Sequence, residues 1–528
     1  MNMVKQPTLV AALLIALLAT GCQPADQPAE NTAAAPKAGA ATPGTAQPQA
    51  AKPQTGTAAG TRYGTLQFAP CTLSSGSAAG NIEAQCASLR VPENPAAPTG
   101  RSIDLKIAWL ESDAGAGSTP DPVFFIAGGP GQSATQVAAI VDMGLHEVRK
   151  RRDIFLVDQR GTGGSHPLAC RDAAGKPLVL ENSSAATAEQ LTDYAGQCAQ
   201  GLRNDADPRY FTTSEAIGDL DAVRAALGVQ TLNLIGGSYG TRVAQHYAAR
   251  YPQHTRTLVI DGVAPNDLVI GGEFARTFED AIALQATQCR KEAACAKRFP
   301  VDTRTQLRQV VERLRQAPVA VDYRDPRTGE LHHEQVTADT VVGLAFGFSY
   351  APQTASLLPL VLDEAAAGRY ASLVALAQMS ASDMSDQMNR LMQWSVLCSE
   401  DAGRYGKDDT LLGAEVAQMF FAPCKAWPTK PTPAADAAPF KSNLPVLLLS
   451  GELDPVTPPR YAERVLQGLP NGRHLVAPGQ GHGVFRLGCM PKVLGQFLQT
   501  ANAKALDAQC VASLNNVPAF TSFNGWEP

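Results

Sequence analysis

The clearest pattern along the chain is a short, unbroken apolar run followed by a glycine-rich polar turn. Residues 122–133, PVFFIAGGPGQS, and residues 152–165, RDIFLVDQRGTGGS, both have this design. Residues 231–240, TLNLIGGSYG, repeat it between two segments with helical spacing, residues 214–229 and 241–252. Short apolar strands that alternate with helices predict an α/β fold, with a mostly parallel sheet covered by helices on both faces.

The pattern changes between residues 265 and 440, where helical spacing replaces the alternation. One hairpin is predicted there, around YRDPRTGELHHE, and strand signals return afterwards in LPVLLLSGELDP and GRHLVAPGQGHG. We therefore predict one α/β core, built from residues 61–264 and 441–528, with residues 265–440 as a largely helical insertion. An insertion above the C-terminal edge of such a sheet lies where ligands bind, which indicates a lid. A separate second domain is the alternative.

The first sixty residues fall outside this pattern. Residues 1–21 combine an early lysine with an apolar stretch that is typical of a signal peptide and too short for a membrane span. The ending LLATGC resembles a bacterial lipoprotein signal, in which Cys22 is lipidated, and Gln23 after it implies outer-membrane sorting. A plain secretory signal is the alternative, since Ala19 stands where such signals usually have leucine. Residues 22–60 are almost entirely Ala, Pro, Gly, Thr and Gln, and predict a disordered tether.

Composition narrows the class of protein. With 45% hydrophobic and 18% charged residues the chain is typical of a globular protein, and its net charge of −5 gives no reason to expect nucleic acid. The cysteines other than Cys22 lie in sequence-near pairs, which indicates disulfides and export; free buried thiols are the alternative. No C-x-x-C occurs and the histidines lack metal-ligand spacing, so we expect no metal and no other cofactor. The pairs that proximity predicts are Cys71–Cys86, Cys170–Cys198, Cys289–Cys295, Cys398–Cys424 and Cys489–Cys510.

Residues 236–240, GGSYG, place Ser238 between a predicted strand and a predicted helix. Serine is a weak nucleophile unless a neighbouring base, itself oriented by an acid, takes its proton. The G-x-S-x-G motif in this context predicts the sharp turn that exposes a nucleophilic serine. We expect Gly236 and Gly240 to let the strand and the helix approach each other, and Gly237 to leave room beside the serine.

An acid and a histidine follow in the order that this type of site requires. Asp454 lies just past a strand in LPVLLLSGELDPVTPP, and His482 lies in a glycine loop past the next strand, in HLVAPGQGHGVF. Parallel strands end at one edge of a sheet, so we expect both to meet Ser238 there. Two carboxylates are alternatives for the acid: Glu452, two residues before Asp454, and Asp261, which we expect instead to brace a loop.

Acyl transfer also needs N–H donors for the oxyanion that develops on the substrate. We expect one from the backbone of Tyr239, directly after the serine. The second is expected from the loop after an early strand, where Gly129 or Gly128 can donate and Pro130 cannot. A simple tight turn is the alternative for this loop.

Together, GGPGQS, DQRGTGGS, GGSYG, SGELDPVTP and GQGHG resemble the prolyl and tripeptidyl aminopeptidase group of α/β-hydrolases, over about residues 62–515. The cysteine-rich, exported form with a long insertion is most similar to the tripeptidyl aminopeptidase branch. The resemblance implies Ser238 as nucleophile, Asp454 as acid and His482 as base, acting on peptides with a free N-terminus. Ala127 stands where prolyl aminopeptidases usually have histidine, which weakens the case for strict N-terminal proline specificity.

An aminopeptidase must also bind an ammonium group, which a lid carboxylate favours. Glu400, next to Asp401 and near Cys398, resembles the family's acidic substrate-binding position; an exposed acidic pair is the alternative. The hypothesis is a serine exopeptidase of the cell envelope that touches the membrane only through a lipid anchor, with a secreted form as the alternative. An esterase or lipase-like hydrolase is the main competing function, and a non-catalytic binding protein is a weaker one.

Overall fold

The computed structural model describes residues 60–74, 80–172, 174–180, 187–385, 388–406, 410, 412–413 and 420–524. The chain divides into two compact units, Met1–Thr57 and Ala58–Pro528, and every described residue belongs to the second. The predicted signal peptide, Cys22 and nearly all of the predicted tether therefore lie outside the described residues.

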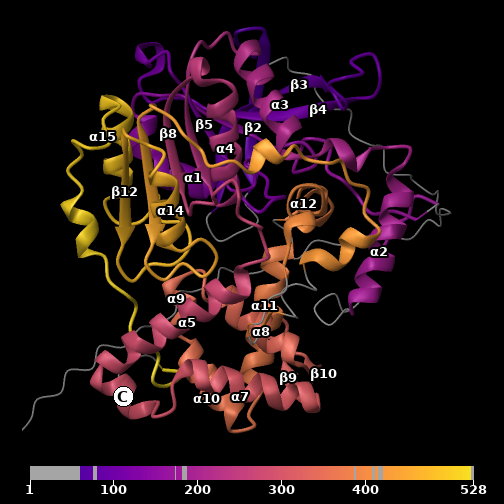
Figure 1. Cartoon of the computed structure of the whole chain (residues 1–528), viewed down its shortest axis with the longest axis vertical. Helices are drawn as coiled ribbons and strands as arrows, with labels where there is room; N and C mark the ends of the chain where they lie inside the picture. The colour runs from indigo at the N-terminus through magenta and orange to yellow at the C-terminus, as the bar shows by residue number, and fades with distance from the viewer. Residues whose placement is uncertain are drawn as a thin grey trace, which may run out of the picture. The chain divides into compact units, whose positions relative to one another are not determined.

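A ten-stranded sheet forms the centre of the second unit, with the order β1-β2-β3-β4-β6-β5-β7-β8-β11-β12 (Figure 1). The six strands from β6 to β12 in this order are parallel, as predicted: β5 Val123–Ile126, β6 Ile154–Val157, β7 Leu232–Gly237, β8 Thr255–Asp261, β11 Val446–Gly451 and β12 Gly472–Ala477. The other four form an antiparallel edge that the sequence pattern did not predict: β1 Thr61–Tyr63, β2 Leu66–Ser74, β3 Asn81–Pro92 and β4 Ser102–Leu110.

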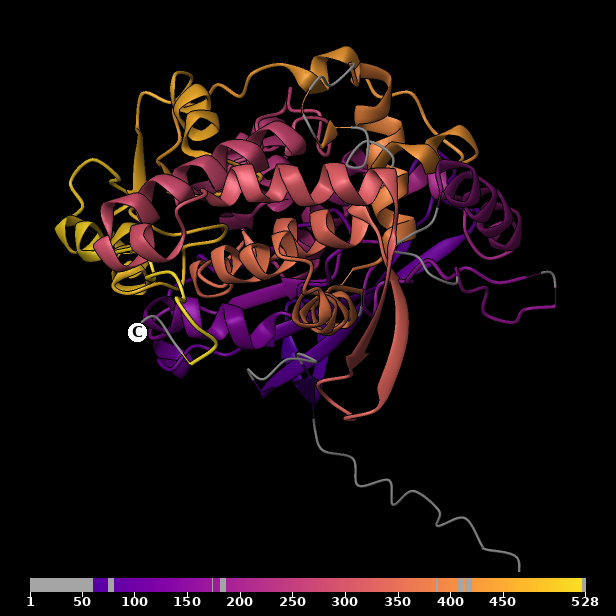
Figure 2. The ribbon, with the colours of Figure 1, turned by 90° about the horizontal axis from the view of Figure 1, so that it is seen from below.

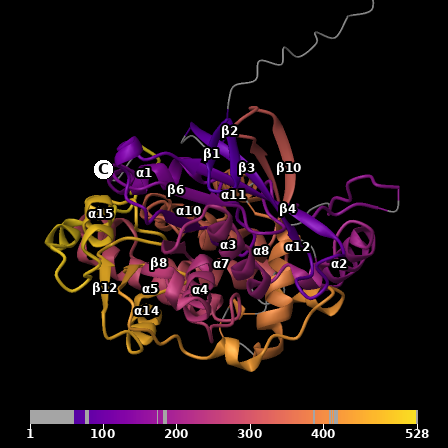
Figure 3. The same ribbon diagram turned by 90° about the horizontal axis from the view of Figure 1, so that it is seen from above.

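Helices cover both faces of the sheet (Figure 3). Successive residues of a strand point to opposite faces, which is why each central strand is apolar throughout. In β11, Leu447 and Leu449 belong to one apolar core, while Val446 and Leu448 belong to the other. The first core includes α1 Ala138–Arg149 and α15 Met490–Thr500; the second includes α2 Ala188–Leu202, α3 Thr213–Ala226, α4 Tyr239–Arg250 and α14 Pro459–Leu466.

The chain between β8 and β11 is largely helical, as predicted, with one hairpin. Its helices lie beyond the strand ends at which the arrowheads of β12 and its neighbours point (Figures 1 and 2). This is the position from which an insertion covers the ligand-binding edge of a parallel sheet. Its elements are α5 Phe274–Lys291, α6 Ala293–Arg298, α7 Thr303–Gln316, β9 Val319–Arg324, β10 Leu331–Val336, α8 Ala338–Phe348, α9 Pro352–Ala355, α10 Leu358–Ala366, α11 Ala371–Ser385 and α12 Arg390–Val396.

Five disulfides join the same cysteine pairs that proximity in the sequence predicts. Their partners are between 6 and 28 residues apart, so each bond closes a local loop. Cys71–Cys86 joins β2 to β3, and Cys398–Cys424 fixes the segment that carries Glu400. Several local disulfides in one chain are typical of an exported protein.

Candidate active site

Ser238 occupies the turn between β7 and α4, where the motif predicts a nucleophile. Its backbone has φ 54° and ψ −125°, a conformation that residues other than glycine rarely adopt and that is typical of functional positions. The Ser238 N–H donates to the carbonyl oxygen of Asp261 at 2.8 Å, so the turn is tied to the end of β8. The serine is partly exposed, whereas the residues that follow it in α4 are buried.

The glycines around the serine differ in how closely other parts of the chain approach them. A Cβ atom on Gly236 would lie 2.4 Å from the carbonyl oxygen of Gly240, and one on Gly240 would lie 2.2 Å from that of Ile126. Both glycines therefore allow the close approach of strand and helix, as predicted. A Cβ atom on Gly237 would meet nothing nearer than Cζ of Phe125 at 4.0 Å. Apart from its chain neighbours Gly236 and Ser238, Gly237 is therefore not crowded, and the expectation that it leaves room beside the serine stays a prediction.

Asp454 and His482 are brought together at the C-terminal edge of the sheet. Oδ2 of Asp454 lies 2.7 Å from Nδ1 of His482. The two residues follow β11 and β12, which are neighbouring parallel strands, and so meet although they are 28 residues apart. Oδ1 of Asp454 accepts the backbone N–H groups of Val456 and Thr457 at 2.9 and 2.8 Å. This arrangement fixes the carboxylate and orients the imidazole ring.

The electrostatics of this pair favour an ionised acid beside a basic imidazole. Burial alone would raise the pKa of Asp454, but His482 and the hydrogen bonds to Asp454 lower it below its usual value. Burial alone would lower the pKa of His482, but the neighbouring carboxylate of Asp454 raises it. A carboxylate that stays charged in this way stabilises the imidazolium that forms when the ring accepts a proton.

Ser238 and His482 both contact the end of β8. Within the described residues, no hydrogen bond joins Oγ of Ser238 to the imidazole ring, a contact that often tightens only when substrate binds. Gly262, which directly follows β8, shows how near the ring lies, because a Cβ atom on it would be 2.8 Å from Cε1 of His482. Gly262 has φ 67°, so both its backbone and the ring favour glycine there.

The two alternative acids have other partners. Oε2 of Glu452 accepts the backbone N–H of Gly479 at 2.7 Å. Asp261 is buried and its Oδ2 accepts two backbone N–H groups of the loop that follows His482, at 2.7 and 2.8 Å. Asp261 therefore braces a loop, as expected, and Asp454 is the carboxylate in hydrogen-bond contact with the histidine.

The glycine-rich loop after β5 lies against the candidate nucleophile. A Cβ atom on Gly128 would be 2.9 Å from Cβ of Ser238. The N–H of Gly128 donates to Oε1 of Gln132 at 3.3 Å, whereas the N–H groups of Gly129 and Tyr239 make no hydrogen bond within the described part of the chain. Of the two predicted glycine donors, Gly129 is therefore the one whose N–H is left without a partner in this part of the chain.

Two segments of the insertion contact this site, and sequence reasoning missed both. The carbonyl oxygen of Tyr350 accepts the backbone N–H of His482 at 2.7 Å, and the two rings pack edge to face with centroids 5.3 Å apart. Asn389 donates its N–H to the carbonyl oxygen of Gly131 at 2.9 Å, and Sδ of Met388 lies over the same loop. The insertion therefore holds the histidine loop and the glycine-rich loop together.

A threonine near the acid was also missed. Oγ1 of Thr457 donates to Oδ2 of Asp454 at 2.9 Å and lies 3.1 Å from Nδ1 of His482. Threonine three residues after an aspartate is a common partner in local side-chain hydrogen bonding, so DPVT was the signal available. The threonine is buried, and it supports the carboxylate that orients the ring.

Glu400 lies in a π-helical turn, Leu397–Asp401, with a side chain that is only 8% exposed. Its carboxylate accepts the N–H and the hydroxyl of Thr213, at the start of α3, at 2.8 and 2.9 Å. Nη1 of Arg242 is 3.7 Å from Glu400 and 3.0 Å from the buried Asp401. Burial raises the pKa of Glu400 to about 7. The alternative of an exposed acidic pair is therefore wrong.

A cavity of about 970 Å³ has Glu400 in its wall. Its other walls include the start of α3, one face of α4 and the chain from Lys430 to Lys441. That volume is within the usual range for small-molecule and peptide sites. The three candidate catalytic residues do not line it; Thr213 connects it to the nucleophile turn, with its hydroxyl 2.7 Å from that of Tyr239.

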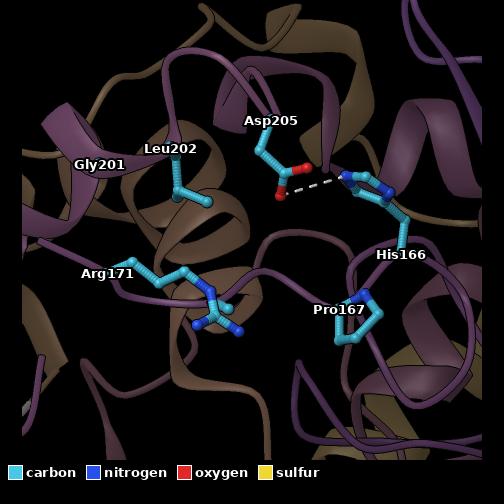
Figure 4. Close-up of a pocket in the computed structure, with 7 residues that line it drawn as sticks. His166, Pro167, Arg171, Gly201, Leu202 and Asp205 are labelled. Carbon is cyan, nitrogen blue, oxygen red and sulfur yellow. Dashed lines mark ion pairs between the residues drawn. The ribbon is translucent and has the colours of Figure 1, made fainter. Parts of the chain in front are cut away.

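A second cavity, of about 540 Å³, lies between the loop after β6 and the end of α2 (Figure 4). His166 and Asp205 face each other across it at 3.6 Å, and Arg171 lies on its far side (Figure 4). None of the predicted site residues lines this cavity.

The described residues contain no group of three or more His, Cys, Asp or Glu side chains that could hold a metal ion. No helix in the described segments is long and apolar enough to cross a membrane.

The sheet, the helical layers and the position of the site agree with the sequence family. A profile of the alpha/beta hydrolase fold matches residues 121–488, more than half of the chain, and the protein belongs to this family. The matched span contains Ser238, Asp454 and His482. The predicted fold class is confirmed.

Several relatives of the chain are named as peptidases. Serine protease Hip1 of Mycobacterium tuberculosis is 27% identical over 465 residues, which cover 81% of this chain and 87% of that protein. Tripeptidyl aminopeptidase of Streptomyces lividans is 25% identical over 468 residues, covering 81% of this chain and 83% of that enzyme. Proline iminopeptidase of Neisseria gonorrhoeae is 28% identical over 160 residues, covering 30% of this chain and 36% of that enzyme. The predicted kinship with this peptidase group is confirmed.

Proposed function

We propose that this protein is a serine aminopeptidase in which Ser238 is the nucleophile, His482 the general base and Asp454 the acid. The observation that carries the proposal is the 2.7 Å contact between Asp454 and His482, at the sheet edge where Ser238 occupies a strained turn. The peptidase names of the relatives support a peptide substrate.

In the proposed reaction, Nε2 of His482 takes the proton from Oγ of Ser238 as Oγ attacks the scissile carbonyl carbon. Asp454 accepts the Nδ1–H of the ring and stabilises the imidazolium that forms. The N–H groups of Tyr239 and Gly129 donate to the oxyanion, where preorganised donors contribute most to the rate.

The imidazolium then protonates the leaving amine, and the peptide C–N bond breaks to leave an ester between Ser238 and the N-terminal fragment. A water molecule gives its proton to His482 and attacks this ester. The fragment leaves with a new carboxylate, and Oγ recovers its proton. Each step uses the same three side chains, so loss of the serine should abolish both bond cleavage and ester formation.

Glu400 is our candidate for binding the substrate ammonium group. Its buried carboxylate borders the 970 Å³ cavity, and Asp401 offsets the charge of the neighbouring Arg242. A bound cation would lower the pKa of Glu400 from about 7 and so favour the charged carboxylate at neutral pH. This role would restrict cleavage to peptides with a free N-terminus.

We further propose that the enzyme acts in the cell envelope, attached by a lipid on Cys22. The five disulfides support an exported protein. The composition of residues 22–60 supports a flexible tether between the anchor and the catalytic unit.

The proposal is tested with chromogenic mono-, di- and tripeptide amides, each with a free and an acetylated N-terminus. We expect cleavage of the free peptides only, and its loss in Ser238→Ala. Equal cleavage of acetylated peptides would overturn the aminopeptidase assignment, and faster turnover of simple esters than of any peptide would favour an esterase. Full activity in Ser238→Ala would overturn the mechanism itself.

A further inference from the structure

Strand β8 ends in a buried carboxylate, that of Asp261, which the proposed reaction does not use. In the sheet, β8 lies between β7, which leads to Ser238, and β11, which leads to Asp454. Asp261 is its last residue, paired with Gly237 on one side and with Leu449 on the other. Asp261 is only 2% exposed, so its charge is held away from water.

Asp261 makes one connection through its backbone and two through its side chain. Its carbonyl oxygen accepts the N–H of Ser238 at 2.8 Å, which holds the nucleophile turn. Its Oδ2 accepts the N–H groups of Val484 and Phe485 at 2.7 and 2.8 Å, which hold the loop two and three residues after His482. One residue therefore ties the nucleophile to the loop of the base.

We propose that Asp261 is a second, positioning carboxylate of the active site, which fixes the loop of His482 and stabilises its imidazolium by charge. This inference rests on the proposed function, because it requires His482 to gain and lose a proton during the reaction. A neutral side chain could accept the same two hydrogen bonds, but only a charged carboxylate could also stabilise the imidazolium.

One oxygen of this buried carboxylate is left unused, so hydrogen bonding to the loop does not by itself explain why a carboxylate stands here. Oδ1 of Asp261 is buried and accepts no hydrogen bond within the described residues, an arrangement that is unfavourable for an ionised group. Gly262, the next residue, lies against the ring of His482, and the carboxylate itself binds the backbone two and three residues after that histidine, near enough for a charge interaction with the ring. A negative charge so placed favours a cation on the ring.

The pKa values of Asp261 and His482 depend on each other and on the groups around them. Burial raises the pKa of Asp261 to about 6, His482 opposes this rise, and the negative charge of Asp454 adds to it. Asp261 in turn raises the pKa of His482, in addition to the larger effect of Asp454. Tyr350, which packs on the ring from the insertion, stays neutral because burial and Asp454 both raise its pKa.

The sign of the expected effect follows from these interactions. Removing the charge of Asp261 removes one stabilising partner of the imidazolium, so the pKa of His482 falls. The acid limb of kcat/KM reports the ionisation of the base in the free enzyme. That limb should therefore move to lower pH. We expect a shift of about one pH unit, the size of the interaction between two neighbouring charges that are partly screened inside a protein.

Asp261→Asn tests the role of the charge, because the amide oxygen can still accept both loop N–H groups. We expect a folded protein whose acid limb moves to lower pH by about one unit and whose plateau kcat falls roughly tenfold, since the weaker base removes the serine proton less readily. Asp261→Glu keeps the charge but displaces the hydrogen bonds, so we expect a loss of rate with the acid limb unmoved.

Asp153→Asn is the matched control. Asp153 is buried just before β6, its carbonyl oxygen accepts the N–H of Val123, and its carboxylate accepts the N–H of Ser112 at 2.9 Å. Like Asp261 it is a buried aspartate whose backbone and side chain both accept N–H groups, but it lies at the opposite end of the strands and also bonds Tyr63. Its variant should leave the acid limb unchanged.

The full pH profile of tripeptide amide cleavage decides between these outcomes. An unmoved limb in Asp261→Asn, or a limb that moves equally in Asp153→Asn, would overturn the inference. If Asp261→Asn does not fold, Asp261→Glu decides: a limb that moves despite the retained charge overturns the inference, and an unmoved limb with a lower rate supports it. Activity in Ser238→Ala would instead overturn the proposed function, so the two failures are distinguishable.

Discussion

Oδ2 of Asp454 lies 2.7 Å from Nδ1 of His482, at the ends of two neighbouring parallel strands. The strands themselves set this contact, because β11 and β12 are paired residue by residue up to Gly451 and Ala477. The acid is therefore held by the sheet, and the base lies on a loop that starts from the sheet.

Replacing the acid by its amide should remove most of the activity without unfolding the protein. In Asp454→Asn the side chain can donate to the ring, which favours the wrong tautomer and no longer stabilises the imidazolium. We expect kcat to fall by about 10⁴. Glu452→Gln is the control, since its amide oxygen can still accept the N–H of Gly479. A larger loss of kcat in Glu452→Gln than in Asp454→Asn would show that Asp454 is not the catalytic acid.

Thr457 should affect catalysis through the acid. Its hydroxyl donates to Oδ2 of Asp454 at 2.9 Å, the same oxygen that faces His482. Thr457→Val removes this donor at nearly constant volume and leaves the carboxylate less well fixed. We expect kcat to fall about tenfold, as for the loss of a hydrogen bond to a charged group, while Thr457→Ser keeps most of the activity. Equal losses in both variants would point to packing of the methyl group instead.

The parts of this site that the sequence predicted are those that local rules determine. Ser238, Asp454 and His482 each follow a short apolar strand, and parallel strands bring their ends to one edge. The contacts from Tyr350 and Met388 come from the connections between helices of the insertion. The apolar pattern of those helices shows that they are packed but not what they or their connections pack against. The antiparallel edge was missed for a related reason: β3 is exposed or half-buried along most of its length, so it lacks a continuous apolar run.

The glycines around Ser238 also show that the sequence predicts a local turn but not the packing around each residue in it. Their cluster around Ser238 predicts a tight turn, but only the packed structure tells which of them is crowded.

Gly240→Ala would place Cβ 2.2 Å from the carbonyl oxygen of Ile126, a backbone atom that cannot move alone. We expect a loss of free energy of unfolding on the order of 3 kcal/mol. Gly237→Ala, whose Cβ would meet only Phe125 at 4.0 Å, should change it by less than about 1 kcal/mol. Denaturant unfolding of both variants measures the difference, and equal losses would contradict the packing argument.

The lipid anchor is tested by changing Cys22. Cys22→Ser removes the thiol that would be lipidated and leaves residues 60–524 unchanged. We expect the native protein to enter the detergent phase on phase separation and the variant to stay in the aqueous phase, because an acyl chain contributes about 0.8 kcal/mol per buried CH₂ group. Activity per mole should be the same in both. Detergent partitioning that is unchanged in the variant would favour a plain secretory signal and a secreted enzyme.

Glu400 provides the test of how the substrate N-terminus is bound. Glu400→Gln keeps an oxygen to accept from Thr213 but removes the charge that would pair with an ammonium group. We expect KM for free tripeptide amides to rise about tenfold or more, with kcat less affected, since a charge-assisted hydrogen bond is lost before the chemical step. Asp436→Asn is the control, as Asp436 borders the same cavity in a different segment.

The pH dependence makes this test sharper. The pKa of Glu400 is about 7, and the ionised form is the one that binds a cation, so KM of the native enzyme should fall as the pH rises through 7. The substrate α-amino group stays largely protonated up to about pH 7.7, so the trend has to be read below that value. In Glu400→Gln the trend should disappear. A variant that keeps both the native KM and its pH dependence would show that Glu400 only caps the start of α3, and the ammonium site would then have to be sought among other residues of the insertion.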